Sequence, residues 1–184
     1  VIWIPKEDLD AYVEKSDAIL IGPGLMRWHS ENSKFEVRNS KTEFDRAGTE
    51  TRMLTKYLLE KFPTKKWVID GGSLQVMRRE WIPKGAILTP NKREFEILFE
   101  EKFTLESLQE IAKKHECIIV YKAPISYVSD GKTTYEIRGG NAGLTKGGTG
   151  DVLAGVITGL VAKNTPLLAA AAGTYLVKKT AERL

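Results

Sequence analysis

Short apolar runs alternate with longer segments of helical spacing along this chain of 184 residues. The first four runs are apolar at consecutive positions, a pattern typical of strands that are buried on both faces of a parallel sheet. Two further runs flank Asp130-Gly-Lys132, which is a strong signal for a hairpin turn. The predicted strands cover 18–21, 67–70, 86–89, 117–122, 126–129 and 133–137.

Helical spacing fills the segments between these strands. The predicted helices cover 50–62, 73–79, 91–99, 104–115, a stretch that ends near 163, and 167–183. The apolar side of the first helix consists of Met53, Leu54, Tyr57, Leu58 and Phe62. Thr104 caps the fourth helix, but Ser107 stands where a capping box has Glu, so no capping box is expected there. Residues 27–51 are polar and predict a long surface loop.

This order of elements predicts an α/β fold in one domain over 1–184, with a mostly parallel sheet between two helical layers. Ligands of such sheets bind beyond the carboxyl ends of the strands. Four predicted strand ends are followed there by Gly22-Pro-Gly24, Asp70-Gly-Gly72, Thr89-Pro-Asn91 and Lys122. We therefore expect a ligand site at this edge, where Asp70 contacts the ligand, caps the following helix or orients a loop.

The segment 141–151 is rich in glycine and continues directly into an apolar helical pattern. Unpaired N–H groups at a helix start attract an anion such as phosphate, and the helix dipole adds to this attraction. Asp151 ends the segment, and a carboxylate beside an anion site suits a base that deprotonates a nucleophile during phosphoryl transfer. The alternative is an ordinary loop in which Asp151 only caps the helix. Lys146 either contacts a phosphate or points to solvent. The segment is not a P-loop, because it lacks the Gly-Lys-Ser/Thr ending. It is not a dinucleotide fingerprint either, because no strand directly precedes it.

Composition excludes several classes of function. The net charge of +4 comes from scattered basic residues, which favours a small phosphate-rich ligand over nucleic acid. Cys117 is the only cysteine and lies in a predicted buried strand, so we expect an inert thiol and a reducing, cytoplasmic location. His29 and His115 lack metal-ligand spacing, and no zinc site is predicted. No apolar run is long enough to span a membrane, and no secretory signal is visible.

Five motifs, taken in order, resemble those of the ADP/ATP-dependent NAD(P)H-hydrate dehydratases, a carbohydrate-kinase-related family of the ribokinase-like superfamily. The motifs are Ile21-Gly-Pro-Gly-Leu25, Ile69-Asp-Gly-Gly-Ser-Leu74, Leu88-Thr-Pro-Asn-Lys-Arg-Glu94, Lys122-Ala-Pro-Ile-Ser126, and Gly140-Asn141 together with 147–155. The last of these is the most specific, and the resemblance covers almost the whole chain. It implies a ribokinase-like three-layer α/β/α sandwich.

The resemblance also implies a reaction, in which ADP or ATP phosphorylates the hydroxyl of hydrated NADH or NADPH and loss of phosphate restores the nicotinamide ring. Asp151 would be the catalytic base. The nucleotide and its phosphates would be bound by Lys122, Ala123, Pro124, Ile125, Ser126, Gly147, Gly148, Thr149 and Gly150. The hydrate would contact Gly24, Asn91, Asn141 and Asp151. Mg²⁺ would be held by the phosphates without a dedicated set of acidic ligands, and a homo-oligomer is expected.

The chain departs from the family pattern at three positions. Asn91 replaces a His, Gly72 replaces a second Asp, and Ala123, followed by Pro124, replaces a Gly. The family's N-terminal portion has no counterpart before Val1, so we expect a fragment, a chain completed by another polypeptide, or an activity that has drifted. Two other functions stay open, a kinase of another small alcohol such as a vitamin precursor and a nucleotide-binding protein without catalysis. The sequence does not decide between ADP and ATP or between NADH and NADPH.

Overall fold

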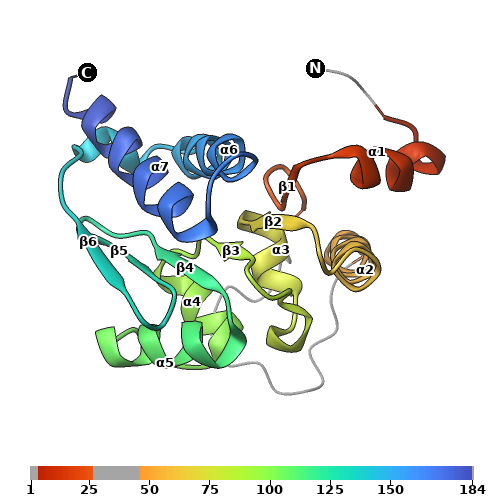
Figure 1. The fold of residues 1–184 in the computed structure, drawn as a ribbon, viewed down its shortest axis with the longest axis horizontal. Helices are drawn as coiled ribbons and strands as arrows, with labels where there is room; N and C mark the ends of the chain where they lie inside the picture. Colours follow the sequence, from red (N-terminus) through yellow and green to blue (C-terminus); the bar gives the residue numbers. More distant parts are fainter. Residues whose placement is uncertain (1–3, 27–45, 184) are drawn as a thin grey trace.

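The computed structural model describes residues 4–26 and 46–183, which form one six-stranded sheet with helices on both faces (Figure 1). The strands lie in chain order across the sheet: β1 (Ala18–Ile21), β2 (Lys66–Ile69), β3 (Ile87–Leu88), β4 (Ile118–Tyr121), β5 (Ser126–Ser129) and β6 (Thr134–Ile137). The pairs from β1 to β4 are parallel, whereas β5 pairs antiparallel with both β4 and β6. The predicted mostly parallel sheet and the hairpin are both confirmed.

Two helical layers enclose this sheet. One layer consists of α6 (Thr149–Val161) and α7 (Pro166–Ala181), and the other contains α2 (Arg46–Lys61), α3 (Gly71–Val76), α4 (Lys92–Phe99) and α5 (Leu105–His115). The shorter elements η1 (Lys6–Asp8), α1 (Leu9–Lys15), η2 (Arg79–Trp81) and η3 (Ala142–Thr145) were not predicted. The three-layer α/β/α architecture expected from the alternating pattern is therefore present.

The strands are apolar on both faces because each face has its own core. Trp67 and Ile69 of β2 point to the layer that contains α2 and α5, while Val68 between them packs with residues of α6 and α7. All three side chains are almost completely buried. Burial of an apolar side chain of this size contributes about 1.5–3 kcal/mol, which explains why consecutive apolar residues were required in the strands.

The first long helix differs from the prediction in both its start and its buried face. It begins at Arg46, so residues 46–51 are helical rather than loop, while 27–45 lie outside the described residues. Met53 and Tyr57 are 67% and 46% exposed, although both were expected on the apolar side. Thr55 is fully buried instead, because its hydroxyl pairs with the Ser73 hydroxyl at 2.9 Å. Two hydroxyls that satisfy each other can thus occupy a core position that looks polar in the sequence.

The start of α5 also corrects the sequence analysis, because a capping box is present there. Thr104 Oγ1 accepts a hydrogen bond from the Ser107 N–H at 3.0 Å, and Ser107 Oγ accepts one from the Thr104 N–H at 2.9 Å. A serine hydroxyl therefore takes the place of the usual carboxylate.

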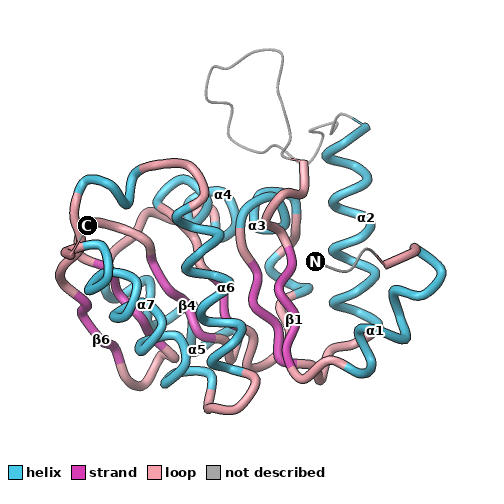
Figure 2. Tube along the Cα trace, turned by 90° about the horizontal axis from the view of Figure 1, so that it is seen from above, coloured by secondary structure: helices cyan, strands magenta, loops and turns pink. Residues whose placement is uncertain are grey.

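The parallel strands direct their carboxyl ends to one edge of the sheet, where α3 and α4 begin (Figure 2). This edge also receives the N-terminus of α6, because a Cβ atom built on Gly150 would lie 3.3 Å from Nζ of Lys122, the residue after β4. The predicted motifs are consequently brought together. In the part of the chain that is described, no helix has the length and apolar character needed to cross a membrane.

Candidate functional site

The loops that follow β1 and β2 are locked together through their backbones. Gly22 adopts a φ of 118°, and a Cβ atom on it would lie 1.7 Å from the carbonyl oxygen of Asp70, so only glycine fits. The Gly72 N–H donates to the Gly22 carbonyl at 3.2 Å, and the Asp70 N–H donates to the Ile21 carbonyl at 3.0 Å. These contacts fix the position of both loops at the carboxyl edge of the sheet.

The same contacts account for one departure from the family pattern. A Cβ atom on Gly72 would lie 2.5 Å from the carbonyl oxygen of Leu25, which is closer than any side chain allows. An aspartate at this position would therefore require the loop that contains Gly24 to move away. The close approach of the loops after β1 and β2 leaves room only for glycine at position 72 in this chain.

A pocket with a volume of about 320 Å³ opens beside these loops. Its lining consists of Gly22, Pro23, Gly24, Leu25, Met26, Gly71, Gly72 and Asp151. The structure thus brings Gly24 and Asp151 together, although 127 positions separate them in the chain (151 − 24). Glycines and apolar residues form most of the wall, and Asp151 is the one charged residue in the lining, a composition typical of a site for a small molecule.

The N-terminus of α6 presents unpaired N–H groups next to this pocket. Gly148 is the N-cap residue with a φ of 92°, and no side chain caps the helix. Within the described residues, the N–H groups of Gly150 and Asp151 donate no hydrogen bond, while the Thr149 hydroxyl donates to the carbonyls of Leu144 and Lys146. We refer to the backbone of residues 147–150 as the amide cradle, and it has the geometry of an anion site.

Asp151 does not cap this helix, so that alternative interpretation is wrong. It lies in the first turn of α6, where the exposed carboxylate is stabilised by the positive end of the helix dipole. Its side chain is therefore free to meet a molecule in the pocket. Lys146 is exposed, and no ion pair holds it among the described residues, so both of its interpretations stay open.

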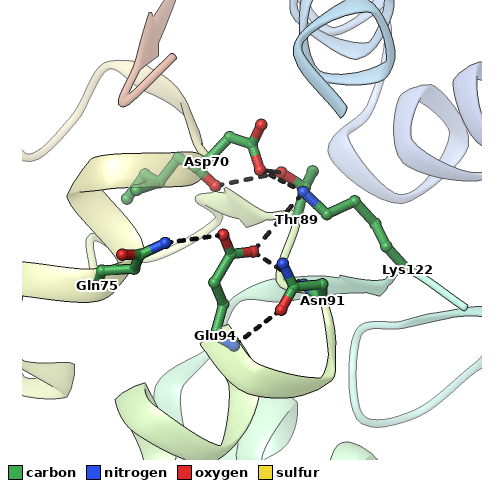
Figure 3. A network of polar contacts seen from close by, with 7 residues as sticks. Asp70, Gln75, Thr89, Asn91, Glu94 and Lys122 are labelled. Carbon is green, nitrogen blue, oxygen red and sulfur yellow. Dashed lines mark hydrogen bonds and ion pairs between the residues drawn. The ribbon is translucent and has the colours of Figure 1, made fainter. Parts of the chain in front are cut away.

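A buried ionic network lies beneath the amide cradle (Figure 3). The Lys122 ammonium donates to Oδ1 of Asp70 at 2.6 Å and lies 3.7 Å from Oε2 of Glu94. The Thr89 hydroxyl also donates to Oδ1 of Asp70, at 2.7 Å. The Asp70 side chain makes no cap hydrogen bond to α3, so its predicted role as a helix cap is wrong. Its other oxygen, Oδ2, would lie 3.8 Å from a Cβ atom on Gly150, which places the network directly against the cradle.

Asn91 and Glu94 anchor the other side of the network. The Asn91 side chain accepts from the Glu94 N–H at 3.0 Å, and the Glu94 carboxylate accepts from the Asn91 N–H at 2.9 Å, which forms the capping box of α4. Gln75 donates to the second oxygen of Glu94 at 3.3 Å. Asn91, predicted to contact substrate, is thus used as a helix cap and does not line the pocket. Glu94 was not assigned a role from the sequence, although the Asn-x-x-Glu spacing before a helix is a readable capping signal.

The segment between β4 and β5 contains the other residues predicted to contact the nucleotide. Here the Ser126 hydroxyl donates to the Ala123 carbonyl at 3.1 Å, and Nζ of Lys178 donates to the carbonyls of both Ala123 and Pro124. Ile125 completes this segment. The sequence analysis gave Lys178 no role, because a lysine in the last turn of a helix is normally expected to face solvent.

Asn141 is also engaged in the fold. Its side-chain oxygen accepts from the Gly143 N–H at 2.8 Å, and its amide donates to the Ala181 carbonyl. Asn141 therefore ties η3 to the end of α7 and does not line the pocket.

Cys117 is nearly inaccessible at 1% exposure, and burial raises the pKa of its thiol to about 12. The expectation of an inert cysteine agrees with this environment. Among the described residues, no three His, Cys, Asp or Glu side chains form a potential metal-binding group.

Comparison with known proteins places this geometry in a family. The model of the NAD(P)H-hydrate dehydratase family matches residues 3–184. The "Bifunctional NAD(P)H-hydrate repair enzyme Nnr" of Methanocaldococcus jannaschii is 35% identical over 127 residues, which cover 66% of this chain and 24% of that protein. The "ADP-dependent (S)-NAD(P)H-hydrate dehydratase" of Enterococcus faecalis is 28% identical over 169 residues, which cover 88% of this chain and 51% of that protein.

A solved structure gives the same result. The ADP/ATP-dependent NAD(P)H-hydrate dehydratase of Bacillus subtilis, co-crystallised with ATP/Mg²⁺ and soaked with CoA, superposes with a TM-score of 0.72 at 25% identity, over 97% of this chain and 61% of that one. The chain thus spans between about a quarter and about three fifths of these three proteins. The family match and the shared ribokinase-like fold lead to one conclusion: this chain belongs to the NAD(P)H-hydrate dehydratase family.

Proposed function

We propose that this chain carries the dehydratase activity of its family, the ADP- or ATP-dependent conversion of hydrated NADH or NADPH to the reduced dinucleotide. One observation carries the proposal: Asp151 lines the same pocket as the Gly24 loop and lies in the first turn of α6, next to the unpaired N–H groups of that helix. A base, an acceptor pocket and an anion site therefore meet at one point.

Asp151 would act as the general base in the first step. Its carboxylate accepts the proton of the hydrate hydroxyl while that oxygen attacks the terminal phosphorus of the nucleotide. A new oxygen–phosphorus bond forms as the bond to the departing nucleotide oxygen breaks. The phosphate then leaves with its carbon–oxygen bonding electrons, and loss of a proton from the neighbouring carbon restores the ring double bond.

The amide cradle would bind the phosphoryl group during this transfer. Three of the four residues at 147–150 are glycines, and the N–H groups of Gly150 and Asp151 donate no hydrogen bond among the described residues, so these N–H groups are available to phosphate oxygens. Such donors are aligned before the reaction begins, and they stabilise the charge that develops in the transition state. Gly147, Gly148, Thr149 and Gly150 remain the proposed phosphate-binding residues.

Lys122 would act on the phosphates from below the cradle. Its ammonium is already bonded to Asp70 and lies close to Glu94, so we propose that it fixes the floor of the site and adds positive potential there. Asn91 and Asn141 are proposed to act on the hydrate through the loops that they cap.

The family resemblance implies Mg²⁺, and the residues present fit an ion held chiefly by phosphates. Asp70 Oδ1 and Glu94 are turned to Lys122, which leaves Oδ2 of Asp70 as a carboxylate oxygen 3.8 Å from the position of a Cβ atom on Gly150. When bound, the ion neutralises phosphate charge.

The adenine nucleotide is proposed to be bordered by the segment after Lys122, which consists of Ala123, Pro124, Ile125 and Ser126. The homo-oligomer and the cytoplasmic location remain predictions.

The test compares the wild-type chain with Asp151→Asn. Hydrated NADH and hydrated NADPH are each supplied with ADP or ATP, and recovery of the dihydronicotinamide absorbance is followed. We expect turnover by the wild type and a loss of about 10²–10⁴-fold in kcat for Asp151→Asn, because the base is removed. Full activity of that variant would contradict the assignment.

The two other functions are separated in the same experiment. Phosphorylation of an alcohol from a panel of vitamin precursors, without turnover of either hydrate, would identify a kinase. Tight binding of ADP or ATP without consumption of the nucleotide would identify a binding protein.

A further inference from the structure

Lys178 is a buried lysine that binds backbone carbonyls in place of a carboxylate. It lies in the last part of α7 and is only 5% exposed. Its ammonium donates to the carbonyls of Pro124 at 2.7 Å, Ala123 at 3.2 Å and Gly139 at 3.2 Å. Within the described residues, no acid lies within ion-pair distance of it. All three donors of the ammonium are therefore used by the backbone.

A charge in this position is costly unless the surrounding dipoles compensate it. Burial lowers the pKa of Lys178, as expected for an ammonium group withdrawn from water. Three carbonyl oxygens replace its hydration shell, and each carries partial negative charge. The arrangement persists only while the two loops that contribute these carbonyls keep their positions, so the lysine and the loops hold each other in place.

The two loops flank the β5–β6 hairpin and meet at its open end, where Ser126 pairs with Ile137. Ala123 and Pro124 precede β5, and Gly139 follows β6. The helix α7 holds the second loop at a further point, because the carboxylate of Glu182 accepts from the Gly140 N–H at 3.2 Å. Nζ of Lys178 is the single atom that contacts both loops.

Both loops lead directly into the proposed phosphate site. Ala123 follows Lys122, whose ammonium lies against Gly150 in the amide cradle. Gly140 is followed by Asn141 and η3, which continue to the cradle at Gly147. A shift of either loop would therefore change the border of the site that receives the nucleotide.

We propose that Lys178 is a positioning residue for the nucleotide: its ammonium group holds the loops at 123–124 and 139–140 in the arrangement that receives ADP or ATP. This inference rests on the proposed function and adds a specific structural determinant of nucleotide affinity to it. It also gives the altered Ala123-Pro124 segment a physical role, because both of its carbonyls are directed to one cation.

The experiment measures nucleotide and hydrate constants for Lys178→Met, Lys178→Arg and a control, Lys132→Met. Lys132 is exposed in the β5–β6 turn and has no part in the site. For Lys178→Met we expect the KM for the nucleotide and the Kd of ADP and ATP, measured by calorimetry without hydrate, to rise between about tenfold and about 100-fold. The KM for the hydrate should stay within about twofold. Lys178→Arg should restore most of the affinity, and Lys132→Met should match the wild type.

The outcomes separate the two proposals. If the wild type turns over the hydrate but Lys178→Met binds nucleotides with unchanged affinity, the inference about Lys178 is wrong and the proposed function stands. If the wild type binds nucleotides without turnover, the proposed function fails, and the Kd comparison still tests Lys178. An equal loss in both KM values and in kcat would indicate general disruption and would overturn the positioning role. If Lys178→Met does not fold, Lys178→Gln, which keeps amide donors without the charge, replaces it in the comparison.

Discussion

Lys122→Met should remove much of the stability of this fold, because it leaves two buried carboxylates without their cation. The side chains of Asp70 and Glu94 are 2% and 3% exposed, and Lys122 is the ammonium that lies between them. Loss of one partner from a buried ion pair costs about 3–5 kcal/mol, since the remaining charge keeps its desolvation penalty. A typical domain is stable by only about 5–15 kcal/mol, so the expected loss is a large fraction of the total.

Urea unfolding followed by far-UV circular dichroism measures this loss. For a urea slope of roughly 2–3 kcal/mol per M, the predicted change lowers the midpoint by about 1–2.5 M. The double variant Lys122→Met/Asp70→Asn is the matched comparison, because the neutral amide can still accept from Thr89 while one orphaned charge is removed. It should be more stable than Lys122→Met alone.

The reasoning would be refuted by a loss below about 1 kcal/mol for Lys122→Met, which is the range of a solvent-exposed pair. The reasoning would likewise be refuted if the changes in unfolding free energy of Lys122→Met and Asp70→Asn added up in the double variant, because the two side chains would then have no interaction energy. Lys122→Arg retains the charge, and its stability controls for the change in side-chain shape.

The other predictions concern the pocket wall, a buried hydroxyl pair and the thiol. Gly72→Ala should weaken hydrate binding, because the added methyl group displaces the Leu25 carbonyl, and an unchanged hydrate KM would contradict this. Thr55→Val should cost about 1–3 kcal/mol in urea unfolding by leaving the Ser73 hydroxyl unpaired, and Thr55→Val/Ser73→Ala should cost less than the sum of the single changes. Cys117 should resist thiol reagents until the chain is unfolded. Because burial raises the pKa of its thiol from 9.0 to about 12, its contribution to stability is complete below pH 9 and is lost as the pH rises toward 12, which pH-dependent unfolding would detect.

The sheet was predictable because its signals are local. Consecutive apolar residues in β2 and β4 are needed to fill two cores at once, and the hairpin turn at Asp130 is encoded by its own residues. The position of the site followed from topology, since parallel strands deliver their carboxyl ends to one edge. The meeting of Gly24 and Asp151 in one pocket is a consequence of that rule.

The errors arose where a side chain finds its partner far away in the sequence. Thr55 was left out of the predicted apolar side of its helix, because its partner Ser73 belongs to a different helix. The ammonium of Lys122 is paired with acids, whereas the ammonium of Lys178 is paired with backbone carbonyls. The residues next to each lysine in the sequence do not indicate either pairing. Helical spacing and local capping rules carry no information about such pairings.

The charge balance at the site connects these buried groups to the proposed reaction. Asp70, Glu94 and Asp151 bring three negative charges to the surroundings of the cradle, and Lys122 offsets one of them. The dipole of α6 supplies only about half a positive charge more. Lys146, which is exposed beside the cradle, adds a further positive charge, so the balance is only slightly negative. Under the proposed function, a nucleotide that carries its own cation would therefore be received more readily than a bare polyphosphate, and the described residues contain no group of metal ligands that would supply this cation.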